Sequence, residues 1–180
     1  MDNIVIAFAG QIGSGKSTIS IALAEALGLS RASFGDHVRS VAKQRGLTQD
    51  REMLQIIGSE LIENGWGPFC KAVLSQAGWK MGDSIIVDGI RHIEAIETLR
   101  QMTAPLKFVQ IFISIEEEDR KSRLMSKGIM DKKGKSIIES HSTEAQVYSL
   151  HNEANLVLDG TQPISELVRQ IIGFINSNFI

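Results

Sequence analysis

The segment of residues 1–28 constrains the fold more than any other part of the chain. Residues 4–8 form an apolar run rich in β-branched side chains, which predicts a strand buried on both faces. Residues 10–17 read GQIGSGKS and match the pattern G-x-x-x-x-G-K-[ST] at every fixed position. A helical pattern follows, from about Gly15 to a stop at Gly28. A strand, a glycine-rich turn and a helix in this order indicate a phosphate-binding loop.

Each part of this loop has a physical role in holding phosphate. The glycines permit a backbone turn in which successive N–H groups point at an anion. Lys16 can reach the β and γ phosphates, the Ser17 hydroxyl can bind Mg²⁺, and the helix start adds its positive dipole end. We therefore expect ATP and Mg²⁺ as cofactors. The expected nucleotide-binding residues in the loop are Gly10, Gly13, Ser14, Gly15, Lys16, Ser17 and Thr18.

Two other interpretations of the loop fit the sequence less well. A turn that binds nothing would not require the complete eight-residue pattern between a strand and a helix. A dinucleotide site has the spacing G-x-G-x-x-G, which differs from the spacing here, and has no use for a cation at Lys16.

Length and composition predict one globular domain over residues 1–180. The chain is long enough for one core and short for two, with 43% hydrophobic and 22% charged residues. A net charge of −2 gives no reason to expect nucleic acid or an anionic membrane as a partner, and no apolar segment has membrane-spanning length. The single Cys70 and the absence of a signal-like N-terminus are typical of a cytoplasmic protein.

Strand and helix patterns alternate along the rest of the chain. Further strands are expected at residues 29–34, 85–91, 108–115 and 154–158. Further helices are expected at residues 35–46, 50–64, 68–78, 93–102, 116–127, 136–151 and 164–175. This alternation predicts an α/β fold of three layers, α/β/α, with a parallel five-stranded sheet and right-handed crossovers.

The helices at about residues 36–78 form an insertion that could bind an acceptor substrate. Asp36 and Arg39 lie one helical turn apart and could orient an acceptor hydroxyl or phosphate, but Asp36 is equally well explained as a helix N-cap. Trp66 and Phe69 could stack on a base, although ordinary core packing explains them more simply.

Asp88 and Arg91 stand at the end of the third strand. Ligands bind at the carboxyl edge of open α/β sheets, so Asp88 is predicted to face Mg²⁺ or its bound water. Arg91 is predicted to hold a substrate phosphate by a bidentate contact. The alternatives are a turn-forming acid before Gly89 and a solvated arginine.

Residues 120–136 are predicted to form a small basic lid. Arg120 and Arg123 lie on a charged helix, and residues 128–135 contain two glycines and three lysines. A solvated loop is the alternative. In a phosphoryl-transfer enzyme such a segment would close over ATP and neutralise charge on the transferred group.

With these motifs the chain resembles P-loop kinases of the nucleoside monophosphate kinase group. Residues 34–39, FGDHVR, resemble the T-G-D-x-x-R segment by which adenylate kinases hold the acceptor, with Phe34 in place of the threonine. Residues 88–91, DGIR, are similar to their D-G-[FY]-P-R segment, one residue shorter and without the proline. The resemblance implies acceptor binding by Arg39 and Arg91.

The same resemblance implies contacts on the ATP side. Arg120 and Arg123 match the lid-helix arginines that touch ATP and the phosphates in flight. The turn that includes Gly160 and Thr161 corresponds to the loop that packs on adenine.

Smaller resemblances leave the acceptor open. Asp36 is similar to the acid proposed as general base in dephospho-coenzyme A kinases, whose acceptor is a hydroxyl; a phosphate acceptor is already ionised and needs no base. Residues 54–60 with Trp66 resemble phage deoxynucleoside monophosphate kinases. Residues 67–71 and 88–91 resemble animal phosphomevalonate kinases.

The sequence thus predicts ATP- and Mg²⁺-dependent phosphoryl transfer to a small phosphorylated acceptor, foremost a nucleoside or deoxynucleoside monophosphate. The alternatives are a dephospho-coenzyme A or phosphomevalonate kinase-like activity, or a regulatory ATPase acting on a protein partner. The expected catalytic residues are Lys16, Asp36, Arg91 and Arg123; the expected acceptor-binding residues are Asp36, Arg39, Trp66 and Arg91; the expected metal ligands are Ser17 and Asp88.

Overall fold

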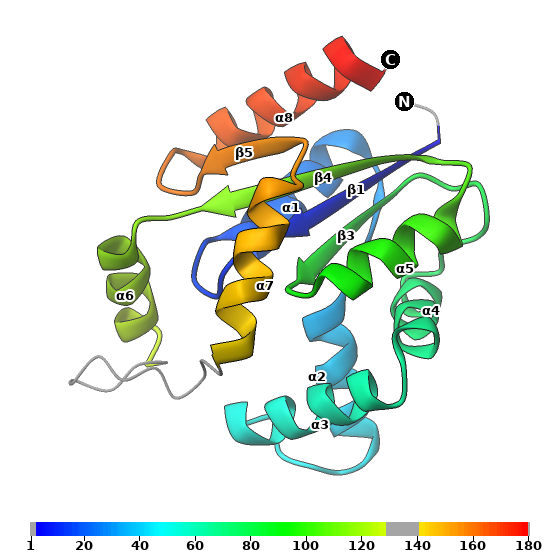
Figure 1. Ribbon diagram of the computed structural model, residues 1–180, viewed down its shortest axis with the longest axis vertical. Coiled ribbons are helices and arrows are strands. Elements are labelled where there is room, and N and C mark those ends of the chain that lie inside the picture. The colour runs from blue at the N-terminus through cyan, green and yellow to red at the C-terminus, as the bar shows by residue number, and fades with distance from the viewer. Residues whose placement is uncertain (1–2, 129–140, 180) are drawn as a thin grey trace.

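The computed structural model describes residues 3–128 and 141–179, in which a parallel sheet is covered by helices (Figure 1). The strands are β1 (Ile4–Ala9), β2 (Ser30–Ser33), β3 (Ile85–Ile90), β4 (Lys107–Ser114) and β5 (Leu156–Asp159). The helices are α1 (Lys16–Leu27), α2 (Phe34–Gln44), α3 (Arg51–Glu63), α4 (Trp66–Gln76), α5 (Ile93–Thr103), α6 (Glu117–Ser126), α7 (His141–Asn152) and α8 (Ile164–Phe179).

The strand order places the phosphate loop at the middle of the sheet. The five strands run parallel in the order β2-β3-β1-β4-β5, so β1 lies between β3 and β4. The chain turns to one side of β1 for β2 and β3, and to the other side for β4 and β5. The carboxyl end of β1 is therefore the point where the winding direction changes, which is where open α/β sheets bind ligands.

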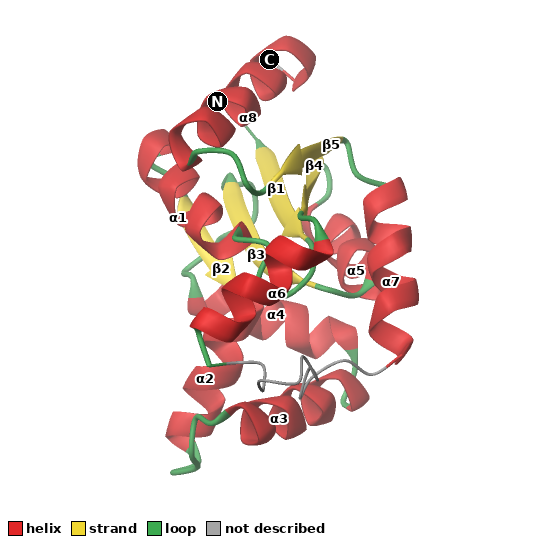
Figure 2. Ribbon diagram, turned by 90° about the vertical axis from the view of Figure 1, so that its left-hand side faces the viewer, coloured by secondary structure: helices red, strands yellow, loops and turns green. Residues whose placement is uncertain are grey.

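Alternate side chains of β1 enter two separate cores. Val5 and Ala7 pack into a cluster with α4, α5 and the end of α7, whereas Ile4, Ile6 and Phe8 pack against α1 and α8. Figure 2 shows these layers, with α1 and α8 on one side of the sheet and α5 and α7 on the other. Burial on both faces explains why the strand sequence is continuously apolar.

The predicted three-layer fold with five parallel strands is confirmed. The insertion between β2 and β3 consists of α2, α3 and α4, as the pattern predicted. Element ends differ by a few residues; α4, for example, begins at Trp66, which leaves Pro68 in the first turn, where its missing N–H is harmless.

Of the two alternatives for Asp36, the helix N-cap is wrong. The N-cap of α2 is Ser33, whose Oγ accepts a hydrogen bond of 3.3 Å from the backbone N–H of Asp36. Asp36 therefore lies in the first turn, and its carboxylate is free for other partners.

Part of the predicted lid lies outside the described residues. Helix α6 covers its first portion, whereas residues 129–136 and the expected start of the next helix at 136–140 are not described. Within residues 3–128 and 141–179, none of the helices has the length and apolarity needed to cross a membrane.

Candidate active site

The phosphate loop has a backbone that glycine makes possible. Gly10 has a φ of 147° and Gly15 a φ of 92°, both in the region that side chains disfavour. A Cβ at Gly10 would also lie 2.7 Å from the carbonyl oxygen of Ile113. Helix α1 begins directly after Gly15, so its N-terminal N–H groups face the loop.

Lys16 is buried beneath this loop. Its Nζ donates a hydrogen bond of 3.0 Å to the carbonyl oxygen of Gln11, and the residue is 6% exposed. Burial, together with the charge of Arg91, lowers the pKa of Lys16 to about 7, although the charge of Asp88 acts in the opposite sense. The loop thus holds a desolvated cation that an anionic ligand would stabilise.

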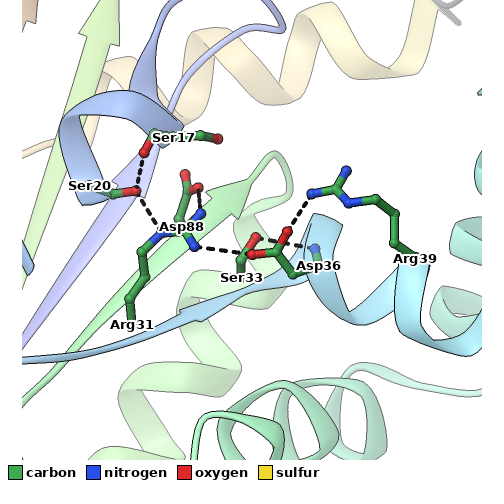
Figure 3. Close-up of polar contacts among 7 residues, drawn as sticks. All are labelled: Ser17, Ser20, Arg31, Ser33, Asp36, Arg39 and Asp88. Atoms are coloured by element: carbon green, nitrogen blue, oxygen red, sulfur yellow. Dashed lines mark hydrogen bonds and ion pairs between the residues drawn. The ribbon is translucent and has the colours of Figure 1, made fainter. Parts of the chain in front are cut away.

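Arg31, on β2, joins three elements around the sheet edge (Figure 3). Its Nε donates to Ser20 Oγ at 2.9 Å, its Nη1 to Asp36 Oδ2 at 3.1 Å, and its Nη2 to Asp88 Oδ2 at 2.7 Å. These partners come from α1, α2 and β3 respectively. The guanidinium therefore ties the helix after the phosphate loop to both acids of the site.

Sequence reasoning missed Arg31. The signal that could have found it is a charged residue inside an expected strand, because a charge that becomes buried requires a partner. Its partner follows from the sheet: β2 pairs with β3, and Ser33 lies opposite Asp88.

Asp88 is fully buried and retains one unused oxygen. Its Oδ2 is paired with Arg31, whereas its Oδ1 has no hydrogen-bond partner among the described residues. A carboxylate oxygen is a ligand type that Mg²⁺ prefers, and a hydroxyl is available at the exposed Ser17 (Figure 3). These two residues fit the predicted metal-binding role.

Asp36 is held between two arginines. Its Oδ2 accepts from Arg31 and its Oδ1 from Arg39. Burial by itself would raise the pKa of Asp36, but the hydrogen bonds from Arg39 and Arg31 outweigh it and keep that pKa below its ordinary value. A carboxylate in this state is a weak proton acceptor.

A cavity of about 480 Å³ opens beside the phosphate loop. Gly10, Gln11, Lys16 and Ser17 are on its loop side, and most of the other lining residues come from α2, α3, α4 and the end of β3. Four cationic side chains line it and, among the described residues, no Asp or Glu does. These cations are Lys16, Arg39, Arg51 and Arg91. The cavity is therefore suited to an anionic ligand.

The same cavity has an aromatic wall. Trp66 stacks on Phe69 with ring centroids 5.8 Å apart and planes at 14°, and it also contacts His92 at 5.1 Å. Phe69 is buried in the core and Trp66 is half-buried against it, and both line the cavity. A planar group of a ligand could pack against this wall.

Arg91 and Arg51 lie on this cavity at the end of β3 and the start of α3. Burial, together with the charge of Arg51, lowers the pKa of Arg91 to about 10, although the charge of Asp88 acts in the opposite sense. Burial also lowers the pKa of Arg51. Sequence reasoning singled out Arg91 and missed Arg51, because the sequence does not show which face of α3 meets the strand ends.

Arg123 and Arg120 both lie on α6, but Arg123 is hydrogen-bonded to the phosphate loop, whereas Arg120 is paired within its own helix. Arg123 donates to the carbonyl oxygens of Ser14, at 3.3 Å, and Gly160, at 2.8 Å, so it joins the phosphate loop to the turn after β5. Arg120 is buried and forms a two-point ion pair with Glu117 at 2.8 and 2.9 Å.

The turn after β5 packs directly on the phosphate loop. The backbone N–H of Gly160 donates to Ser114 at 2.7 Å, and a Cβ at Gly160 would lie 2.4 Å from the carbonyl oxygen of Ser14. Thr161 donates from its N–H and its Oγ1 to Asp159 Oδ1, at 2.9 and 2.7 Å. The two predicted adenine-loop residues are thus adjacent to the loop that would hold the phosphates.

Comparisons with known proteins agree with this arrangement. A protein family described as "AAA domain" matches residues 6–149. A UPF0200 protein of Pyrobaculum aerophilum is 32% identical over 127 residues, which are 71% of this chain and 68% of that protein. A cytidylate kinase of Natronomonas pharaonis is 49% identical over 45 residues, 25% of this chain and 23% of that one.

A solved structure shows the same fold. The shikimate kinase of Aquifex aeolicus superposes with a TM-score of 0.58, covers 97% of each chain and is 20% identical. The prediction of a P-loop kinase fold is thereby confirmed.

Proposed function

Given that the chain belongs to the AAA domain family and to the family of UPF0200 proteins, we propose that it transfers a phosphoryl group from ATP to a small phosphorylated acceptor, foremost a nucleoside or deoxynucleoside monophosphate. The observation that carries this proposal is the cavity beside the phosphate loop. It joins Lys16 and Ser17 to an aromatic wall and to three arginines, and no Asp or Glu is among its described lining residues.

The state of Asp36 favours a phosphate over a hydroxyl as the accepting group. A hydroxyl acceptor needs a base to remove its proton, whereas a phosphate is already ionised. Asp36 is paired with Arg31 and Arg39, which lowers its affinity for a proton. The short similarity to a cytidylate kinase supports the same choice.

The site residues would then act by position and charge. The loop N–H groups and Lys16 would hold the β and γ phosphates, and Ser17 and Asp88 would hold Mg²⁺. When bound, Mg²⁺ supplies positive charge that offsets the charge on the donor phosphates. Arg51 and Arg91 would supply the positive charge around the acceptor, and Arg39, paired with Asp36, lines the same cavity. Trp66 would pack on the base.

The proposal is tested by offering the protein a panel of acceptors with ATP and Mg²⁺. The panel contains nucleoside and deoxynucleoside monophosphates, dephospho-coenzyme A and phosphomevalonate, and products are identified by mass. We expect a diphosphate product from one nucleotide and none from Lys16→Ala. A product from dephospho-coenzyme A alone would contradict the phosphate acceptor. ATP hydrolysis that a protein partner accelerates, with no small acceptor used, would favour the regulatory ATPase.

Asp36→Asn is expected to weaken acceptor binding without removing a base. Loss of a catalytic base lowers kcat by about 10²- to 10⁴-fold. We expect kcat to fall by less than about tenfold and the KM of the acceptor to rise, because Arg39 and Arg31 lose the carboxylate that orients them. Above about pH 5 the pH profile of kcat/KM should keep its shape, since the pKa of Asp36 lies below its ordinary value. If the wild type showed a fall in kcat/KM on acidification above about pH 5 and Asp36→Asn lacked that fall, Asp36 would be identified as a base.

A further inference from the structure

Arg51 occupies a position that is unfavourable for a cation. It is the first residue of α3, where the positive end of the helix dipole opposes its charge. Of the two acids adjacent to it in the sequence, Asp50 is the helix cap and accepts from the backbone N–H of Met53 at 3.0 Å. The other acid, Glu52, lies in the first turn without an ion pair to Arg51. Arg51 forms no ion pair with any described residue, and its Nε is buried without a hydrogen-bond partner.

Arg91 shows the same features on the facing side of the cavity. It directly follows β3, its Nε is buried without a partner, and it has no ion pair among the described residues. The charge of Arg51 is close enough to lower the pKa of Arg91. Two desolvated guanidiniums that disfavour each other thus line one cavity, an arrangement that destabilises the ligand-free protein.

The other arginines near the acceptor cavity are already neutralised. Arg39, which the family pattern would pair with Arg91, is bound to Asp36 and its side chain is 50% exposed. Arg31 is bound to Asp36 and Asp88. Arg45, beyond the cavity, forms a two-point pair with Glu60 at 2.7 and 2.8 Å.

We propose that Arg51 and Arg91 together form the binding site for a phosphate monoester dianion, the anionic group of the acceptor, and that Arg39 positions Asp36 instead of holding the substrate. This assignment rests on the proposed function, and it departs from the pairing of Arg39 with Arg91 that the resemblance implies. A dianion between two guanidiniums forms charge-assisted, bidentate hydrogen bonds and removes the repulsion between them.

The site is placed for transfer. Lys16 of the phosphate loop, Arg91 after β3 and Arg51 at the start of α3 all line the same cavity. An anion on Arg91 and Arg51 is consequently held in the cavity next to the donor phosphates, with Trp66 and Phe69 available for the remainder of the acceptor.

The test is a calorimetric titration of inorganic phosphate into protein saturated with ADP and Mg²⁺, so that the phosphate loop is already filled. We expect Arg51→Gln and Arg91→Gln each to weaken phosphate binding by at least about tenfold. Arg39→Gln should change it less than either. Arg45→Gln, which alters an exposed ion pair, is the matched control and should leave it unchanged. An effect of Arg39→Gln as large as that of Arg51→Gln, or no phosphate binding by the wild type at millimolar concentration, would overturn the assignment.

A second readout needs neither nucleotide nor turnover. The melting temperature of ligand-free Arg51→Gln should exceed that of the wild type, because the substitution removes an uncompensated charge. A lower melting temperature would contradict the inference. If phosphate binds through Arg51 and Arg91 but no acceptor is phosphorylated, the proposed kinase function fails and this site stands. If an acceptor is phosphorylated and Arg51→Gln leaves the KM of that acceptor unchanged, the kinase function stands and the assignment of Arg51 to the phosphate site fails.

Discussion

Lys16→Met is expected to yield a protein that is inactive and yet more stable than the wild type. In the folded chain burial lowers the pKa of Lys16 from 10.5 to about 7, so the charged form is disfavoured by folding. This penalty is complete below pH 7, where Lys16 is charged in both states, and corresponds to roughly 5 kcal/mol. It declines as the pH rises from 7 and disappears near pH 10.5, where the unfolded chain also loses the proton.

Chemical denaturation at pH 6 and pH 9 measures this effect. The methionine variant should have the larger free energy of unfolding at pH 6, and its advantage should shrink by about 1.4 kcal/mol per pH unit above pH 7. Phosphoryl transfer should fall by at least about a hundredfold, since the cation on the phosphates is lost. Lys80→Met removes an exposed lysine and is the control for the change in net charge. Equal stability of Lys16→Met and wild type at pH 6 would show that the buried charge is not penalised.

Gly160→Ala is expected to disturb nucleotide binding from outside the phosphate loop. The added Cβ would lie 2.4 Å from the carbonyl oxygen of Ser14 and 2.8 Å from Ile113 Cγ2, closer than any real contact allows. The loop backbone must therefore move, and overpacking of this kind destabilises by about 1 to 3 kcal/mol. We expect ATP affinity to fall by at least about tenfold, because the displaced N–H groups no longer converge on phosphate.

Gly173→Ala provides the matched control. Gly173 lies in α8, and a Cβ there would have no atom within 4 Å. Alanine favours helix over glycine by about 1 kcal/mol, so this variant should be slightly more stable and bind ATP normally. Isothermal titration with ATP and thermal denaturation of both variants complete the comparison. Normal ATP affinity in Gly160→Ala would mean that the turn after β5 can yield without moving the phosphate loop.

Much of the fold could be predicted from periodicity. The apolar run of β1 and the complete phosphate-loop pattern located the central strand, and the alternation of strand and helix patterns predicted the remaining architecture. Parallel strands bring their carboxyl ends to one edge, which is why Asp88 and Arg91 could be assigned to the same site as Lys16 without knowledge of the strand order.

The sequence could not show which side chains distant along the chain come into contact in the folded protein. Arg31 meets Asp88 because β2 lies beside β3, and nothing local in either strand specifies that pairing. Arg51 lines the cavity from the first turn of α3, and the sequence does not show which face of that helix meets the strand ends. The N-cap of α2 is Ser33, three residues before Asp36, and the sequence offered both residue types as possible caps.

The contacts of Arg31 make several positions of the chain interdependent. If Asp36 and Asp88 were both replaced while Arg31 remained, a guanidinium that is only 17% exposed would lose both of its counter-charges. Replacing all three by apolar side chains of similar volume would remove the charges together and would be less harmful to folding. The effects of substitutions at these positions are therefore not additive. A substitution of one of these three residues is tolerated only when the other two change as well. Over evolutionary time we therefore expect the three residues to change as a group or not at all.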